Sequence, residues 1–363
     1  MVYLITSFIS SLFSITNQNK NIQNFNYLNF IFFIYLIVII GLRFEVGGDW
    51  NSYKYLYYRN LENFDIKNIF FARDPFFKLL NYLSQFILLD YFGVNLITAI
   101  IVIFCIHKFS LNMPDYWLSI HITIPVILFL MTMSFNKQAI ALSVALLGFI
   151  NLNKSNYLKS FFYFTISTMF HFSAVFNFLI FFIYLIKKYP LSILVFIFIF
   201  LIIFNLNLYN LYLHYINEYI IKQRYSGGAQ IRIILNLIPS IIIIYLFLFN
   251  NYKEKIPFYI LIMSLLTFIV FIMSFIFSTA MDRLNFYLIP LQLFTYGYLF
   301  SNINLQFSII LKYFVLLIYI IYFPLFLIFS THGGNWAPYK NLIVCNYTSL
   351  NKVYINKLNF LCE

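Results

Sequence analysis

The sequence predicts an all-α, polytopic membrane protein, and three observations support this fold class. Hydrophobic residues make up 63% of the 363-residue chain and charged residues only 9%, a balance that exceeds what a water-soluble domain can bury. Apolar runs long enough to cross about 30 Å of hydrocarbon as helices recur along the whole chain. Polar residues gather between these runs, so we expect one transmembrane domain over residues 1–363 and no separate soluble domain.

The apolar runs predict about twelve membrane-spanning helices. The first run lacks the cationic start and the small-residue cleavage site of a removed signal peptide, so we interpret it as a membrane helix. A stretch over 75–89, which follows Asp74, is amphipathic but short and interrupted, and we expect it to be interfacial or re-entrant. The predicted spans are 2–16, 25–42, 93–109, 117–133, 137–152, 157–170, 173–187, 190–208, 232–249, 257–278, 284–300 and 308–329.

Lysine and arginine are distributed differently between the loops, and this difference predicts the orientation. With the amino terminus outside, the short cytoplasmic loops hold many lysines and few acids, as the positive-inside rule requires. These lysines are Lys20, Lys108, Lys154, Lys159, Lys187, Lys188, Lys253, Lys255 and Lys312. The extracytoplasmic loops are then 43–75 and 206–231, followed by a tail over 330–363.

All six arginines fall on the extracytoplasmic side in this orientation. They are Arg43, Arg59, Arg73, Arg224, Arg232 and Arg283. Arginines can simply decorate long external loops. However, guanidinium groups bind phosphate bidentately and stay charged, so we expect some of them to contact lipid-linked phosphate.

Composition also limits the cofactors and partners. The three cysteines, Cys105, Cys345 and Cys362, have no pairing pattern and no metal-ligand spacing, so we expect no disulfide framework, no metal and no other cofactor. A formal charge of +12 would suggest a nucleic-acid partner in a soluble protein. Here the charge follows the membrane loops, so we expect no nucleic acid.

The segment 43–53 is the first candidate for a functional site. It places Arg43 and Asp49 directly after an apolar run, and Gly47 and Gly48 allow a tight turn that brings the charges together. Two interpretations stay open at this point. Asp49 could neutralise Arg43 in a charge-paired loop, or it could orient the arginine in a phosphate or sugar site.

Polar and ionisable residues return to the same side at three later places. Lys137 and Gln138 begin a predicted helix, where free amides and the helix dipole favour an anion, although a lysine reaching for water explains Lys137 equally well. His171 follows an apolar run and could accept a proton from a sugar hydroxyl, although such a histidine more often joins two helices. Arg283 follows Asp282 and again places an acid next to an arginine.

Two further segments carry candidates for substrate contacts. Arg224 lies in 221–230, a loop with two glycines that could close over a substrate. The segment 333–339 offers Trp336 and Tyr339, an aromatic pair that could stack on sugars, although anchoring at the membrane interface explains both residues as well.

The succession of these motifs resembles the EpsG family of bacterial polysaccharide polymerases, which are Wzy-type O-antigen and exopolysaccharide polymerases. The resemblance runs from about residue 1 to residue 340, and two positions depart from it. The family commonly has Arg at Lys137 and Glu-Pro at Asp74-Pro75; both changes keep the charge, but an ammonium lacks the bidentate fork. The motifs are Arg43-x-x-x-Gly47-x-Asp49-x-x-x-Tyr53, Asp74-Pro75-x-Phe77-x-x-Leu80-Asn81, Lys137-Gln138-x-x-Ala141, His171-x-Ser173-Ala174, Arg283-x-x-x-Tyr287 and Trp336-x-Pro338-Tyr339.

This resemblance implies a metal-independent glycosyltransferase of the glycosyltransferase C-like class. The enzyme would be a multi-pass protein of the bacterial inner membrane with an extracytoplasmic active site. It would join oligosaccharide repeat units carried on undecaprenyl pyrophosphate, with membrane lipid and a chain-length regulator protein as further candidate partners. The candidate pyrophosphate ligands are Arg43, Lys137, Gln138, Arg224 and Arg283; the candidate catalytic residues are His171 and Asp49; the candidate sugar contacts are Tyr53, Trp336 and Tyr339.

Two other functions stay open at the level of the sequence. A ligase that moves finished polysaccharide onto the lipid A core would use the same donor and similar arginines. A flippase or other transporter of lipid-linked oligosaccharide would be expected to bury charges at mid-membrane and to show repeated halves. Because the ionisable residues gather at one face and the halves do not match, we favour the polymerase.

Overall fold

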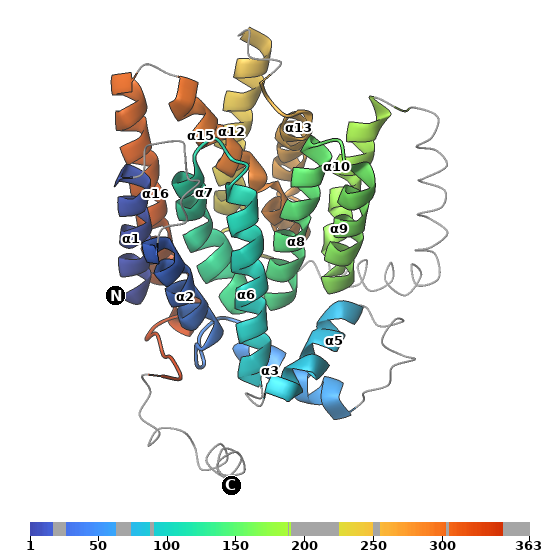
Figure 1. Ribbon diagram of the computed structural model, residues 1–363, viewed down its shortest axis with the longest axis vertical. Helices are drawn as coiled ribbons and strands as arrows, with labels where there is room; N and C mark the ends of the chain where they lie inside the picture. Colours follow the sequence, from blue (N-terminus) through green and yellow to red (C-terminus); the bar gives the residue numbers. More distant parts are fainter. Residues whose placement is uncertain are drawn as a thin grey trace.

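The helices of the computed structural model stand side by side in one bundle, with α3 and α5 lying at its lower end (Figure 1). The structure describes residues 1–16, 27–62, 74–87, 91–187, 189, 225–249, 255–302 and 305–343. In these ranges the regular elements are helical, apart from an isolated β-bridge between Arg43 and Asn341. The all-α prediction is therefore confirmed.

The α-helices of the described ranges follow the apolar pattern of the sequence. Short 3-10 helices connect several of them: η1 (Gln85–Ile87), η3 (Phe172–Val175), η5 (Phe286–Leu288) and η6 (Gly333–Asn335). The α-helices are α1 (Val2–Thr16), α2 (Tyr27–Gly41), α3 (Trp50–Glu62), α5 (Pro75–Ser84), α6 (Tyr91–Ser110), α7 (Tyr116–Thr123), α8 (Asn136–Asn153), α9 (Tyr157–Phe170), α10 (Phe176–Ile186), α12 (Ala229–Phe249), α13 (Phe258–Met273), α14 (Ser278–Asn285), α15 (Pro290–Asn302) and α16 (Leu305–Phe329).

Each predicted span except 190–208, which lies outside the described residues, overlaps one of these helices. Within the described ranges, three helical segments are long and apolar enough to cross a membrane: α6, α12 and Phe307–Phe329 of α16. Shorter apolar helices stand beside them. Several apolar membrane-spanning helices mark the chain as an integral membrane protein.

The apolar run 117–133 contains a change of helix type that the sequence did not predict. After α7 the chain continues as a π-helix, η2 (Ile124–Thr132). A π-helix changes the usual pattern of backbone hydrogen bonds, and such segments are frequent near functional sites. The Phe129 carbonyl in η2 accepts a hydrogen bond from the Trp336 indole at 3.1 Å, so a side chain from the far end of the sequence packs against this segment.

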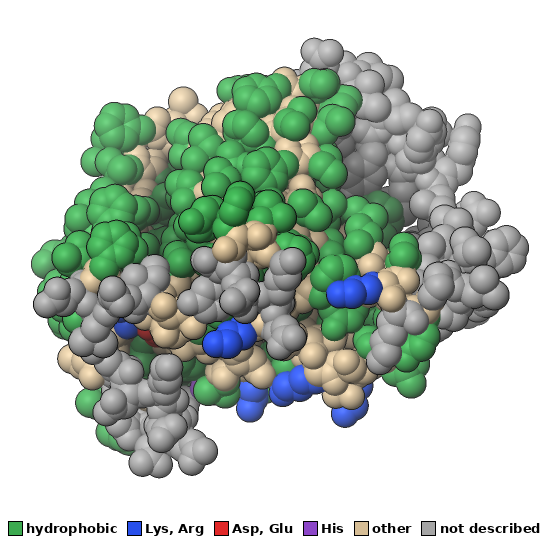
Figure 2. Space-filling model, turned by 90° about the horizontal axis from the view of Figure 1, so that it is seen from above, with side chains coloured by type: hydrophobic (Ala, Val, Ile, Leu, Met, Phe, Trp, Pro, Cys, Tyr) green, Lys and Arg blue, Asp and Glu red, His purple; other side chains and the backbone are tan. Residues whose placement is uncertain are grey.

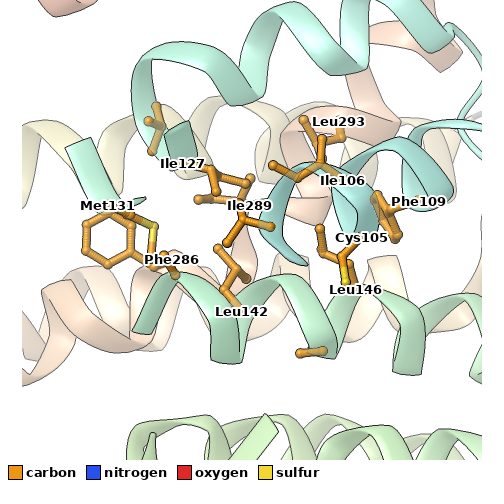
Figure 3. Close-up of a cluster of buried hydrophobic side chains, with 14 of the residues drawn as sticks. Cys105, Ile106, Phe109, Ile127, Met131, Leu142, Leu146, Phe286, Ile289 and Leu293 are labelled. Atoms are coloured by element: carbon orange, nitrogen blue, oxygen red, sulfur yellow. The ribbon is translucent and has the colours of Figure 1, made fainter. Parts of the chain in front are cut away.

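Small residues on α8 allow its close packing against α9, as the sequence suggested. Ser167 donates to the Ala141 carbonyl at 2.6 Å, and Ser160 donates to the Gly148 carbonyl at 3.0 Å. A Cβ at Gly148 would lie 2.5 Å from the Phe164 ring. On another face of α8, apolar side chains from α6, η2, α8, η5 and α15 meet in a buried cluster (Figure 3). This packing fixes the start of α8, where Lys137 lies.

The two ends of the bundle carry different charged residues. At the upper end, where α6, α8 and α10 finish, the exposed cations are lysines such as Lys108, Lys154 and Lys187. Figure 2 shows this end with cations gathered along one side and apolar side chains over much of the rest. Arg43, Arg232 and Arg283 lie at the opposite end, by the end of α2, the start of α12 and in α14.

The turn after α2 is joined to the segment after α16 by backbone hydrogen bonds. Phe44 N donates to Lys340 O at 3.0 Å, and Gly47 N donates to Asn335 O at 2.8 Å. Gly47 has a φ of +110°, and a Cβ there would lie 1.8 Å from Met133 O. The glycine is therefore required by both backbone conformation and space.

We expect Gly47→Ala to destabilise the protein by about 2–4 kcal/mol, because the change adds backbone strain and a clash with Met133. Gly334→Ala is the matched control, since a Cβ there would meet nothing within 4 Å. Thermal unfolding of both purified variants, together with their yield of monodisperse protein, measures the effect. Equal Tm values for Gly47→Ala and the wild type would contradict this prediction.

Candidate functional site

The carboxylate of Asp74 is the centre of a buried polar cluster. Asp74 precedes α5, where Pro75 occupies the first helical turn, and its side chain makes no capping bond to that helix. Instead, Oδ2 accepts a hydrogen bond from Lys137 Nζ at 2.9 Å, and Oδ1 accepts one from Phe172 N at 3.3 Å. His171 Nδ1 lies 3.5 Å from Oδ1. We call Asp74, Lys137 and His171 the Asp74 cluster.

His171 is held at the junction of two helices. Its backbone is extended, with φ −158° and ψ 124°, and it separates α9 from η3. Its side chain is buried, and burial lowers the pKa of His171; the nearby carboxylate of Asp74 acts in the opposite direction, whereas Arg283 and Lys137 lower the pKa further. The imidazole is therefore neutral at neutral pH and is able to accept a proton.

Asp49 and Arg283 bring two more charges to the same end of the bundle. Asp49 is half-buried. Burial raises the pKa of Asp49, while the positive charges of Arg283 and His332 act in the opposite direction. Because Arg283 acts on both Asp49 and His171, it links Asp49 electrostatically to the Asp74 cluster.

Tyr53 is close enough to Asp49 and Asp74 for both charges to act on its phenol. Burial is the main cause that raises the pKa of Tyr53, and the charges of Asp49 and Asp74 raise it too, while a hydrogen bond with the backbone of Lys137 lowers it. Its ring packs against Phe77 at 5.6 Å. The phenol therefore stays protonated and lies beside the first turn of α8.

Gln138 connects α8 to α14. Its Nε2 donates to the Arg283 carbonyl at 2.7 Å. Nearby, Ser173 and Tyr287 share a hydrogen bond at 3.0 Å between their hydroxyls, which joins η3 to η5. These contacts fix α14 relative to the start of α8, so Arg283 and Lys137 are held at one end of the bundle.

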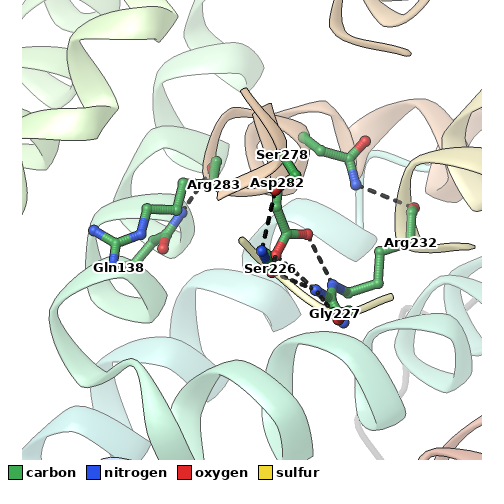
Figure 4. A network of polar contacts seen from close by, with 8 residues as sticks. Gln138, Ser226, Gly227, Arg232, Ser278, Asp282 and Arg283 are labelled. Carbon is green, nitrogen blue, oxygen red and sulfur yellow. Dashed lines mark hydrogen bonds and ion pairs between the residues drawn. The ribbon is translucent and has the colours of Figure 1, made fainter. Parts of the chain in front are cut away.

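Asp282, which precedes Arg283 in the sequence, pairs with Arg232 of α12. Arg232 Nε donates to Oδ1 at 2.8 Å, and Arg232 donates from its terminal nitrogen to Oδ2 at 2.7 Å. Ser226 also donates to Oδ2 at 2.8 Å. Figure 4 shows Asp282 facing Ser226 and Arg232, while Arg283 extends on the side of Gln138. The segment around Ser226 is thus tied to α14.

Arg43 is buried, and its guanidinium pairs with groups other than Asp49. Its side chain is 1% exposed and packs at 5.7 Å from the Trp50 ring. The guanidinium donates to the carbonyls of Ile40 and Val46 and to the side-chain oxygens of Asn95 and Asn136. Burial lowers the pKa of Arg43 to about 10, so it remains charged at neutral pH. In this position Arg43 joins α2 to α6 and α8.

Trp336 is buried in the packed protein, and Tyr339 is half-buried. Trp336 is 2% exposed, and its carbonyl accepts a hydrogen bond from Tyr3 at 2.8 Å. Tyr339 donates to the Ile39 carbonyl at 2.8 Å. Both residues therefore fasten the segment after α16 to the bundle, an arrangement that neither sugar stacking nor interface anchoring anticipated.

Sequence reasoning missed three residues of this end of the bundle, and one predicted residue lies outside the described ranges. Asp74 was visible only as part of an Asp-Pro motif, Arg232 as one of six arginines, and His332 lacked charged neighbours in the sequence. Arg224 is not among the described residues. The Asp-Pro motif before an amphipathic helix was the one available signal for Asp74.

Comparison with known proteins agrees with the succession of motifs. No match was found among curated proteins or among solved structures. The family model described as "EpsG family" matches residues 26–341, which is most of the chain. On this match the chain belongs to the EpsG family, which is linked to exopolysaccharide synthesis.

Proposed function

We propose that the protein is a polysaccharide polymerase that joins oligosaccharide repeat units carried on undecaprenyl pyrophosphate. The observation that carries the proposal is the cluster of Lys137, His171, Asp74, Arg283 and Asp49 at one end of the bundle. These residues come from α8, the α9–η3 junction, the start of α5, α14 and the turn before α3. Cations and a neutral imidazole at the end of a membrane bundle suit a substrate whose lipid tail lies in the bilayer and whose diphosphate lies at its surface.

The chemistry of such a substrate requires few catalytic groups. The bond from sugar to pyrophosphate already has a good leaving group, so the enzyme must hold the diphosphate, stabilise its developing charge and orient the attacking hydroxyl. Arg283 and Lys137 are the candidate cations for the diphosphate, with Gln138 fixing Arg283 through its backbone. His171 and Asp49 are the candidates that orient or deprotonate the acceptor hydroxyl.

Other predicted residues take supporting roles in this proposal. Arg43 holds the helices that present Lys137 and does not itself contact the diphosphate, because its guanidinium is engaged with Ile40, Val46 and two asparagines. Tyr53 is the candidate sugar contact that lies beside the cluster. We place the site at the extracytoplasmic face of the bacterial inner membrane, since the lysine-bearing ends of α6, α8 and α10 lie at the opposite end.

Deletion of the gene tests the proposal. We expect cells without the protein to carry surface polysaccharide with single repeat units, and an intact gene on a plasmid to restore long chains. Electrophoresis of the extracted polysaccharide shows the chain lengths. A normal ladder of long chains in the deletion strain contradicts the polymerase, loss of every repeat unit favours the ligase, and repeat units retained on the cytoplasmic side favour a transporter.

A further inference from the structure

We infer that Asp74 is the positioning residue for a catalytic base at His171, which acts through Nε2, and that Lys137 serves to hold Asp74. This inference rests on the proposed polymerase function and selects one of its two candidate bases. It also changes the role expected for Lys137, from a ligand of the diphosphate to the counter-ion of a buried carboxylate.

The contacts of Asp74 support a fixed carboxylate. It is 8% exposed, and its two oxygens face different partners: Oδ2 faces Lys137 Nζ at 2.9 Å, while Oδ1 faces Phe172 N at 3.3 Å and His171 Nδ1 at 3.5 Å. Burial opposes ionisation of Asp74. However, His171 and Lys137 act in the opposite direction, outweigh burial and hold the pKa of Asp74 well below its usual range. A carboxylate that accepts hydrogen bonds from two helix ends, with an imidazole beside it, has little freedom to turn.

The position of this carboxylate determines which nitrogen of His171 is available. Nδ1 faces the negative charge of Asp74, which favours a proton on Nδ1 and leaves the lone pair on Nε2. Nδ1 is buried, and its contact with Asp74 is longer than a good hydrogen bond, so the pair has room to shorten when the ring becomes charged. Among the described residues, the groups that lower the pKa of Asp49 are Arg283 and His332, which is a different arrangement from a carboxylate facing an imidazole.

The proton and electron balance of the step is simple. The acceptor hydroxyl oxygen forms a bond with the anomeric carbon, and the bond from that carbon to the pyrophosphate oxygen breaks with its electron pair on the leaving group. His171 Nε2 takes the hydroxyl proton and becomes an imidazolium. Asp74 stabilises this cation through Nδ1, and the proton then leaves to solvent as the lipid pyrophosphate departs.

Lys137 is engaged by Asp74 and by the Phe77 ring, which lies 5.3 Å from its Nζ. With His171 neutral, the charges of Lys137 and Asp74 cancel within the cluster. The lysine therefore stabilises the ionised form of Asp74 within the cluster.

The pH dependence gives the inference a clear sign. The charged groups that face His171 are Asp74, Lys137 and Arg283; burial, Lys137 and Arg283 lower the pKa of His171, while Asp74 raises it. Wild-type activity should therefore fall on acidification at a pH below the ordinary histidine range. Asp74→Asn removes the group that raises this pKa, so the fall of activity on acidification should occur at a still lower pH than in the wild type. The maximal rate of chain extension should also fall, by about 10²-fold or more.

The activity experiment uses membranes of the deletion strain that contain each variant, supplied with a lipid extract of the same strain in which unextended repeat units accumulate. We expect Asp74→Asn to lose chain extension as stated and Asp74→Glu to recover at least a tenth of wild-type activity. The double variant Asp74→Asn with Lys137→Met removes both charges. It still tests the inference if the protein with the single change fails to fold. Full activity with an unchanged pH profile in both neutral variants overturns the inference.

A second measurement separates this inference from the proposed function. Nitrogen-15 NMR of histidine-labelled full-length protein reports which nitrogen of His171 carries the proton, with His171→Gln to identify the signals. We expect an Nδ1–H ring in the wild type and loss of that preference in both neutral variants. If wild-type membranes extend no chains, the proposed function fails. The NMR result still decides whether His171 Nδ1 carries the proton that faces Asp74. An Nε2–H ring in the wild type overturns the inference whatever the activity.

Discussion

Arg283→Ala is expected to reduce chain extension by about 10²–10³-fold while leaving the protein in the membrane. A guanidinium that stabilises charge developing on a diphosphate contributes to the transition state, and removal of one such group has an effect of this order. The structure places the charge of Arg283 where it acts on both Asp49 and His171, and the Arg283 carbonyl is held by Gln138 at 2.7 Å. Arg283→Lys should recover part of the activity, since an ammonium keeps the charge but not the bidentate geometry.

The control for this prediction is Lys340→Gln. Lys340 is an exposed cation at the same end of the bundle, 3.3 Å from Glu45, and an exposed pair of this kind contributes little. Polysaccharide ladders from deletion cells that express each variant give the measurement, with the amount of variant in the membrane determined by immunoblot. Long chains at wild-type abundance from Arg283→Ala would remove Arg283 from the proposed site.

Asp282→Asn is expected to destabilise the protein by about 3–5 kcal/mol, because it leaves the buried guanidinium of Arg232 without its carboxylate. The carboxylate accepts two hydrogen bonds from Arg232 and one from Ser226, so the change weakens several contacts of α12 and α14 at once. The helix that carries Arg283 should then be less well fixed. A fall in Tm in detergent, accompanied by loss of chain extension, is the expected result.

Glu45→Gln is the matched control for Asp282→Asn, since it also removes a carboxylate from an ion pair. The Lys340–Glu45 pair is about half exposed on both sides, whereas Arg232 and Asp282 are 13% and 10% exposed. We therefore expect Glu45→Gln to leave Tm nearly unchanged. Similar Tm values for the two variants would show that the buried Arg232–Asp282 pair contributes no more to stability than the exposed Lys340–Glu45 pair.

The apolar pattern of the sequence predicted the helices well because lipid imposes a simple requirement. A helix that satisfies its own backbone in hydrocarbon needs only length and apolar side chains, and both are visible in a single sequence. The small residues of α8 were also informative, since Gly148 meets Phe164 and Ser167 meets Ala141. The π-helix at 124–132 was not predicted, because its apolar side chains are compatible with either helix type.

The partners of the charged residues could not be predicted in the same way. Asp49 and Asp282 each have an arginine nearby in the sequence, yet Asp49 interacts with Arg283, and Asp282 pairs with Arg232. Which charges meet depends on how helices far apart in the sequence pack, and proximity along the chain carries little information about this. Arg43 illustrates the consequence, since a residue expected at a surface is enclosed by carbonyls and asparagines of three helices.

Aromatic residues gave a similar difficulty. Tryptophan is a residue type that often stacks on sugars or anchors a helix at the membrane interface. The Trp336 indole instead donates a hydrogen bond to the carbonyl of Phe129 inside the bundle. That hydrogen bond depends on a carbonyl presented by the π-helix. Without the helix type, the role of Trp336 was not readable from its local sequence.

The position of a bound lipid diphosphate tests the central claim most directly. A cryo-EM structure of the wild-type protein in nanodiscs with undecaprenyl pyrophosphate should place the two phosphates beside Arg283, at the end of the bundle that carries Asp49 and His171. Phosphates bound at the opposite end, among Lys108, Lys154 and Lys187, would contradict the proposed site.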